Sequence, residues 1–180
     1  CCQGAAAKYA DFGGISAPPL LTKIGTSHII YRYCTEKSCS VLKGNHQMND
    51  IKVLKFGGSS LADAEHFLQV KKIVEAEEAR RYVVPSAPGR RFPGDDKVTD
   101  LLYSCYDAVR SGEDIDPVFD RITERYTAII DGLGIDLDLS SEFDQIRNSI
   151  THHAGRDYAA SRGEYLNGII LAKLLGYDFI

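Results

Sequence analysis

The sequence has no tryptophan, a single methionine and no apolar run near the length of about 20 residues that a membrane-spanning helix needs. It contains no Walker-A pattern and no glycine-rich loop of the protein-kinase type, which disfavours both of those nucleotide-binding families. Its first residues also lack the basic region and apolar stretch of a secretory signal. These absences predict a soluble cytoplasmic protein without a membrane partner.

The chain has little excess charge of either sign. Its 180 residues carry a formal net charge of −4, and 44% are hydrophobic and 26% charged. This is the composition of an ordinary globular domain. A mildly acidic chain is poorly suited to nucleic acids, which require a basic face, so no nucleic-acid partner is predicted.

Cysteines are scarce in most of the chain. Four of the five lie in the first 47 residues, at positions 1, 2, 34 and 39, and only Cys105 follows. A lone cysteine in the main body favours a reducing cytosol over a disulfide framework. The early cysteines and His46 could be read as a zinc site, but their spacings match no standard zinc-finger pattern. No metal site is therefore predicted within the protein.

The chain divides into two segments of different character. Residues 1–47 show no clear helical or strand period, and the only methionine, Met48, lies just before an apolar run. Our hypothesis is that Met48 is the true start, and that residues 1–47 are a non-homologous or disordered segment not translated natively. A genuine N-terminal extension is the alternative. Residues 48–180 are predicted to form a partial catalytic domain.

The most informative stretch is Ile-Lys-Val-Leu-Lys-Phe-Gly-Gly-Ser-Ser at 51–60. An apolar run ends in Lys55, two glycines and two hydroxyls, and a helical pattern follows. This order brings together a cation, closely approachable backbone N–H groups and a helix N-terminus, all of which favour phosphate oxygens. The alternative is an ordinary strand, turn and helix with a surface lysine.

From residue 48 onward the patterns predict an α/β fold. Ser59 or Ser60 is expected to cap the first helix, with Asp63 at capping-box spacing. Gly176 is expected to end the last helix in a left-handed conformation. The predicted strands are 51–56, 82–84 and 177–180, the predicted loop is 85–97, and further helices are predicted at 99–110, 117–131, 141–153 and 157–175.

Alternating strands and helices predict a mainly parallel sheet, which binds ligands beyond the carboxyl ends of its strands. Lys55 and Ser86 follow the ends of two such strands. A cation and a hydroxyl at one sheet edge suit phosphoryl transfer, where charge must be neutralised on several oxygens. From the residues alone, Ser86 either binds a small substrate or caps the turn. Arg90 and Arg91 are loop charges or phosphate ligands.

Two further residues have a structural and a functional interpretation. Thr99 is either a helix cap or a site residue. Glu164 is either a solvated first-turn glutamate or a carboxylate that receives an ammonium group. The neighbouring Gly163 is expected to leave room for a ligand.

Four stretches together resemble the N-terminal part of aspartate kinases, which belong to the amino-acid kinase family. They are Lys-Phe-Gly-Gly-Ser-Ser at 55–60, Val-Val-Pro-Ser-Ala-Pro-Gly at 83–89, Lys-Val-Thr-Asp-Leu-Leu at 97–102 and Ser-Arg-Gly-Glu-Tyr-Leu-Asn at 161–167. The similarity covers about residues 49–180. Pro85 departs from the valine or leucine common before the Ser-Ala pair.

The resemblance implies a kinase that uses ATP and Mg²⁺ to phosphorylate the side-chain carboxylate of L-aspartate, the first step toward lysine, threonine and methionine. It implies that Lys55 is catalytic and holds ATP phosphates, together with Gly57, Gly58 and Ser59. It assigns the substrate to a second set of residues, namely Ser86, Thr99 and Glu164.

The resemblance also implies a three-layer α/β sandwich and a homo-oligomeric full-length protein. Aspartate kinases continue into a further nucleotide-binding segment and paired regulatory modules. We therefore expect these 180 residues to be an N-terminal fragment with little kinase activity alone. The alternatives are another amino-acid kinase, such as one acting on glutamate, and a non-catalytic remnant that binds partners through an exposed sheet edge.

Overall fold

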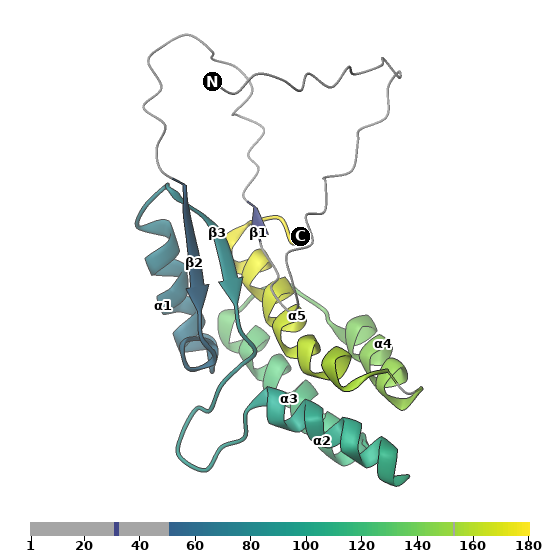
Figure 1. The fold of residues 1–180 in the computed structure, drawn as a ribbon. Coiled ribbons are helices and arrows are strands. Elements are labelled where there is room, and N and C mark those ends of the chain that lie inside the picture. Colours follow the sequence, from purple (N-terminus) through teal and green to yellow (C-terminus); the bar gives the residue numbers. More distant parts are fainter. Residues whose placement is uncertain (1–30, 33–50, 153) are drawn as a thin grey trace, which may run out of the picture.

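Two parallel strands, each followed by a turn or loop that leads to a helix, organise the structure (Figure 1). The structure is a computed structural model that describes residues 31–32, 51–152 and 154–180. Its elements in chain order are β1 (Tyr31–Arg32), β2 (Lys52–Phe56), the 3₁₀ turn η2 (Gly58–Leu61), α1 (Ala64–Glu75), β3 (Arg80–Pro85), α2 (Val98–Ser111), α3 (Asp116–Leu133), α4 (Ser140–Thr151) and α5 (Arg156–Leu175).

The described sheet has the strand order β1-β3-β2. Strands β2 and β3 are parallel, with Lys55 opposite Val84 and Phe56 opposite Pro85. The two strands therefore end side by side, and the residues that follow them emerge at one edge. The predictions of a mixed α/β fold and of a parallel pair of strands are confirmed.

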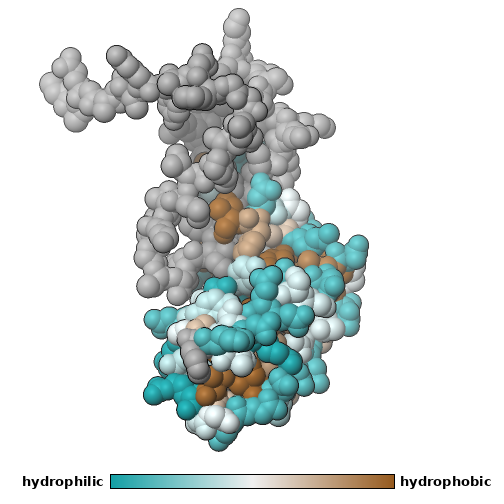
Figure 2. All heavy atoms as spheres, turned by 90° about the vertical axis from the view of Figure 1, so that its right-hand side faces the viewer, coloured by the Kyte–Doolittle hydropathy of each residue, from teal (hydrophilic) through white to brown (hydrophobic). Residues whose placement is uncertain are grey.

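The hydrophobic core lies among the helices and against β3. Phe67 of α1, Leu102 of α2, Phe119 of α3 and Leu166 of α5 are all fully buried. Helix α5 packs against both α2 and β3. The face seen in Figure 2 is mostly hydrophilic over the described residues, with hydrophobic residues in smaller patches. None of the helices among the described residues is long and apolar enough to span a membrane.

The free thiol of Cys105 belongs to this core. It is completely buried on α2, and burial raises its pKa to about 11. The group therefore stays protonated at neutral pH and packs as a small apolar side chain.

The predicted start of the first helix was wrong. Ser59 and Ser60 lie in η2, and Asp63 is the residue that caps α1, with its carboxylate accepting the His66 backbone N–H at 3.0 Å. The chain makes a four-residue 3₁₀ turn before the α-helix begins at Ala64. The N-terminus of α1 is consequently not at the glycine pair, and the helix dipole expected there is absent.

The other helices match their predicted ranges to within two residues at each end. Gly176 has a φ of +67°, and its left-handed conformation at the end of α5 is confirmed. The predicted strand at 177–180 was wrong, because the described chain forms only an isolated β-bridge at Asp178. The Phe179 ring instead contacts Tyr165 edge-on, with 5.5 Å between centroids.

Within residues 1–47 the structure describes only Tyr31–Arg32, which form β1 antiparallel to β3. The sequence pattern did not indicate a strand there. The four early cysteines, His46 and Met48 lie outside the described residues. The hypotheses of a zinc site and of an internal start therefore stay predictions.

Candidate active site

A cavity of about 440 Å³ opens where β2 and β3 end. Five of the seven residues predicted from the sequence line it, although they come from four separate stretches of the chain. The lining residues are Gly58, Ser59, Ser86, Ala87, Pro88, Gly89, Arg90, Lys97, Thr99 and Glu164.

The other two predicted residues, Lys55 and Gly57, do not line this cavity. Lys55 is exposed near the end of β2, where Leu54 and Phe56 pack against the core. Because side chains alternate along a strand, Lys55 projects from the other face of β2. Gly57 is also exposed and has open space around the position of a Cβ. Lys55 thus lies three positions before Gly58, the first residue of the cavity wall, at the same strand end.

Backbone hydrogen bonds tie the two strand ends together. The Ser86 N–H donates to the Phe56 carbonyl at 2.9 Å, and the Gly89 N–H donates to the Gly58 carbonyl at 2.9 Å. Pro85 has no N–H, yet the pairing continues because the next residue supplies the donor. The turn at 57–61 and the loop at 86–97 therefore form one connected wall.

Three glycines allow this wall to form. A Cβ on Gly58 would lie 2.7 Å from the Ala87 carbonyl oxygen, and one on Gly89 would lie 2.7 Å from the Gly58 carbonyl carbon. A Cβ on Gly163 would lie 2.5 Å from the Ala87 Cβ. Gly163 was expected to leave room for a ligand, and this was wrong, since that room is filled by the loop itself.

Helix α5 contributes Glu164 and holds the loop from behind. The fully buried Asn167 donates from Nδ2 to the Ser86 carbonyl at 2.6 Å. The hydroxyl of Tyr126, on α3, donates to the Gly163 carbonyl at 2.8 Å. Burial raises the pKa of Tyr126 well above its usual value, so the hydroxyl remains a neutral donor. Asn167 lies within the motif at 161–167, but its link to Ser86 spans 81 residues and has no local signal.

The charge on the cavity wall is mixed, with cations in excess. Arg90 and Lys97 are exposed and have no ion pair with the described residues, while Glu164 is the carboxylate of the wall. Two cations beside one carboxylate suit a ligand that carries both anionic groups and an ammonium group. Sequence reasoning left Arg90 undecided between a loop charge and a phosphate ligand, and it assigned no role to Lys97.

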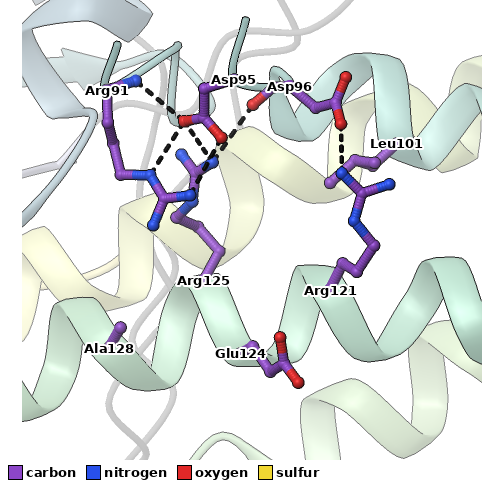
Figure 3. Close-up of a pocket in the computed structure, with 8 residues that line it drawn as sticks. All are labelled: Arg91, Asp95, Asp96, Leu101, Arg121, Glu124, Arg125 and Ala128. Carbon is purple, nitrogen blue, oxygen red and sulfur yellow. Dashed lines mark hydrogen bonds and ion pairs between the residues drawn. The ribbon is translucent and has the colours of Figure 1, made fainter.

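An ion cluster fixes the loop at 86–97 from its other side (Figure 3). The Asp95 carboxylate accepts the backbone N–H of Arg91 at 3.0 Å and two of its guanidinium N–H groups at 2.9 and 3.0 Å. It also accepts Nη2 of Arg125 at 2.7 Å. These donors hold the pKa of Asp95 well below its usual range, with the Arg91 side-chain bonds as the largest cause. Arg91 is thus engaged in this cluster and does not line the cavity.

The region resembles known proteins in sequence and in structure. The chain is 41% identical over 83 residues to aspartokinase 3 of Bacillus subtilis, a match covering 46% of this chain and 18% of the relative. It superposes on Clostridium acetobutylicum aspartate kinase with a TM-score of 0.68 and 51% identity, over 70% of this chain and 29% of that one. The chain is homologous to a portion of the aspartate kinases.

A more distant structure shares the fold alone. Escherichia coli aspartokinase III, solved in complex with aspartate and ADP, matches with a TM-score of 0.55 at 23% identity, over 70% of this chain and 29% of that one. No protein-family model matches the chain. This chain therefore spans less than a third of the length of each aspartate kinase compared.

We expect Gly163→Ala to destabilise the protein by about 1–3 kcal/mol, because its new methyl group would overlap the Ala87 side chain in a packed interior. Urea unfolding measures the change. The double variant Gly163→Ala, Ala87→Gly removes the overlap and should regain most of the loss. Gly155→Ala, at a position with open space, is the control. A double variant no more stable than Gly163→Ala would contradict the proposed contact.

We expect Asp95→Asn to cost about 3 kcal/mol at neutral pH, because it leaves the buried Arg125 without its carboxylate. The folded-state pKa of Asp95 is depressed, so its contribution is present above the unfolded value of 3.8 and is lost as pH falls below it. The difference from wild type should therefore hold at pH 5 and narrow as pH falls below 3.8 in urea titrations. Asp96→Asn, in an exposed pair, is the control. A difference that stays constant with pH would contradict this role.

Proposed function

We propose that this chain is the part of an aspartate kinase that holds the phosphates and the amino-acid substrate. The reaction is ATP-dependent phosphorylation of the L-aspartate side-chain carboxylate to 4-phospho-L-aspartate. A carboxylate oxygen forms the new bond to the γ-phosphorus as the bond to ADP breaks. The observation that carries the proposal is the cavity at the strand ends, where residues of all four aspartate kinase-like stretches meet.

On the phosphate side, the turn at Gly58–Leu61 offers its first amides, which have no acceptor within the turn. Lys55 supplies a positive charge at the same strand end, and no side-chain ion pair with described residues occupies it. We propose that Lys55, Gly57, Gly58 and Ser59 bind ATP phosphates, with Lys55 neutralising charge on the transferring group.

On the substrate side, Glu164 faces the loop that carries Ser86, and both line the cavity with Thr99. We propose that Glu164 receives the ammonium group of aspartate and that Ser86 and Thr99 donate hydrogen bonds to its carboxylates or to the phosphate. Arg90 and Lys97 add positive charge to the wall, which a dicarboxylate substrate favours.

Mg²⁺ belongs to the proposal as a companion of ATP. The described residues contain no group of three or more histidine, cysteine, aspartate or glutamate side chains that could hold a metal ion. Mg²⁺ commonly keeps several waters and binds through substrate phosphates with few protein ligands. The residues present therefore fit an ion delivered with the nucleotide, where it neutralises phosphate charge.

The finer architectural predictions are part of the same proposal. We infer that residues 48–180 belong to a three-layer α/β sandwich that is completed by further chain, in a cytoplasmic enzyme that assembles as a homo-oligomer. Ile51, just before β2, and Val53, on β2, are 56% and 63% exposed, which supports a sheet that is extended or covered in the complete domain.

The proposed function is tested by ADP release from ATP and Mg²⁺ in a protein of the relatives' length that contains this region. L-Aspartate should drive turnover, and L-glutamate at the same concentration should not. Glu164→Gln should raise the KM for aspartate and leave the KM for ATP nearly unchanged, since it removes the charge that is proposed to bind the ammonium group. ADP release with L-glutamate but not with L-aspartate would indicate another amino-acid kinase. ADP release with neither amino acid would reject the proposed function.

We expect Lys55→Ala to lower kcat by about a hundred- to a thousandfold in that protein, because charge on the transferring phosphoryl group loses its cation. Lys52→Ala is the matched control, being an exposed lysine on the same strand that pairs instead with Glu77. Steady-state kinetics of both variants measure the effect. Equal rates for the two variants would remove Lys55 from the catalytic machinery.

A further inference from the structure

Arg125 is a buried cation that does not line the proposed active site. It lies on α3, its side chain is only 5% exposed, and its guanidinium points to the loop at 86–97 (Figure 3). Nη1 donates to the Gly89 carbonyl at 3.1 Å, while Nη2 donates to the Asp95 carboxylate at 2.7 Å and to the Asp96 carbonyl at 3.3 Å. Burying a guanidinium costs free energy unless its N–H donors are hydrogen-bonded. These three bonds therefore compensate the burial of Arg125 and fix its orientation.

These contacts join the two ends of one loop. Gly89 lies near the start of the loop and Asp95 and Asp96 near its end, and a single planar fork reaches both. A lysine at this position would carry the charge but lacks the second arm. The guanidinium therefore holds the loop closed against α3.

Gly89 passes this constraint on to the phosphate turn. Its carbonyl accepts from Arg125, and its N–H donates to the Gly58 carbonyl at 2.9 Å. The backbones at Gly58 and Gly89 also lie too close to admit a Cβ on either residue. A shift of Gly89 would thus change the placement of the turn that carries Ser59 relative to the loop that carries Ser86.

We propose that Arg125 is a positioning residue that sets the spacing between the phosphate turn and the substrate loop. Its effect on catalysis rests on the proposed function, whereas its effect on the loop does not. Neutralising Asp95 is not its main contribution, because Arg91 already gives that carboxylate three hydrogen bonds. Its distinct contribution is the bond to the Gly89 carbonyl, which connects the start of the loop to Asp95 and Asp96 at its end.

The first test is amide hydrogen exchange in the 180-residue chain, which needs no activity. Arg125→Met should speed exchange of the Gly89 N–H by roughly ten- to a hundredfold, the loss expected for a hydrogen bond from a charged donor. Exchange in β2 and α5 should stay near wild type. Arg121→Met is the control, since Arg121 lies one turn away on α3 and its ion pair within the described part of the chain is an exposed one with Asp96.

Arg125→Lys covers the case in which the methionine variant does not fold. It keeps the buried charge, and it should still speed Gly89 exchange because it cannot hold both ends of the loop. Gly89 exchange equal to that of Arg121→Met, or a uniform rise throughout the protein, would overturn the proposal. The uniform rise would mean that Arg125 serves global stability only.

The second test is kinetic and uses the longer protein of the ADP-release assay. Arg125→Met and Arg125→Lys should lower kcat by roughly tenfold or more while the KM values for ATP and aspartate change little. The reason is that the phosphate turn and the substrate loop each stay intact but are misplaced relative to each other. A rise in KM with unchanged kcat would overturn the positioning role. If the wild-type protein forms no ADP, the proposed function fails, and Gly89 exchange still decides whether Arg125 positions the loop.

Discussion

The backbone contact between Gly58 and Gly89 is the constraint on which the candidate site depends. It joins the turn after β2 to the loop after β3, through an N–H to carbonyl bond of 2.9 Å and an approach too close for any side chain. The parallel pairing of Phe56 with Pro85 brings the two segments together, and the glycines let them touch. The cavity is the space left beside this contact.

Ion pairing divides the arginines and lysines around the site into two groups. Arg125 is buried and shares the Asp95 carboxylate with Arg91, where it fixes backbone. Lys55, Arg90 and Lys97 are exposed, and among the described residues none of them forms an ion pair. Arg125 and Arg91 therefore fix the backbone around the site. Lys55, Arg90 and Lys97 can instead contribute their charge to an anionic ligand. This separation is what a site for phosphates and carboxylates requires, because a cation already paired in the interior contributes little to a ligand.

Several layers of support stand behind the cavity. Asn167 and Tyr126 hold the Ser86 and Gly163 carbonyls, and Ala87 fills the space that Gly163 leaves. The contacts with Ser86 and Ala87 join α5 to the loop that follows β3, and the bond from Tyr126 joins α3 to α5.

The sequence alone determined the features that repeat locally. The apolar runs indicated β2 and β3, and the helical periods located α2 to α5. The motifs indicated Ser86, Thr99 and Glu164 as site residues, which line one cavity in the structure. Tertiary structure decided the rest. Asp63 replaced the serines as a cap because an intervening 3₁₀ turn delayed the helix, and residues 177–180 formed no strand.

The tertiary structure also decided what Gly163, Asn167 and Arg125 do. Their partners lie between 29 and 81 positions away in the chain, and a contact over such a separation leaves no period or spacing in the sequence. Local patterns report which residues can form an element. Only the packed chain fixes which distant carbonyl or carboxylate each side chain meets, because that depends on strand register and helix placement together.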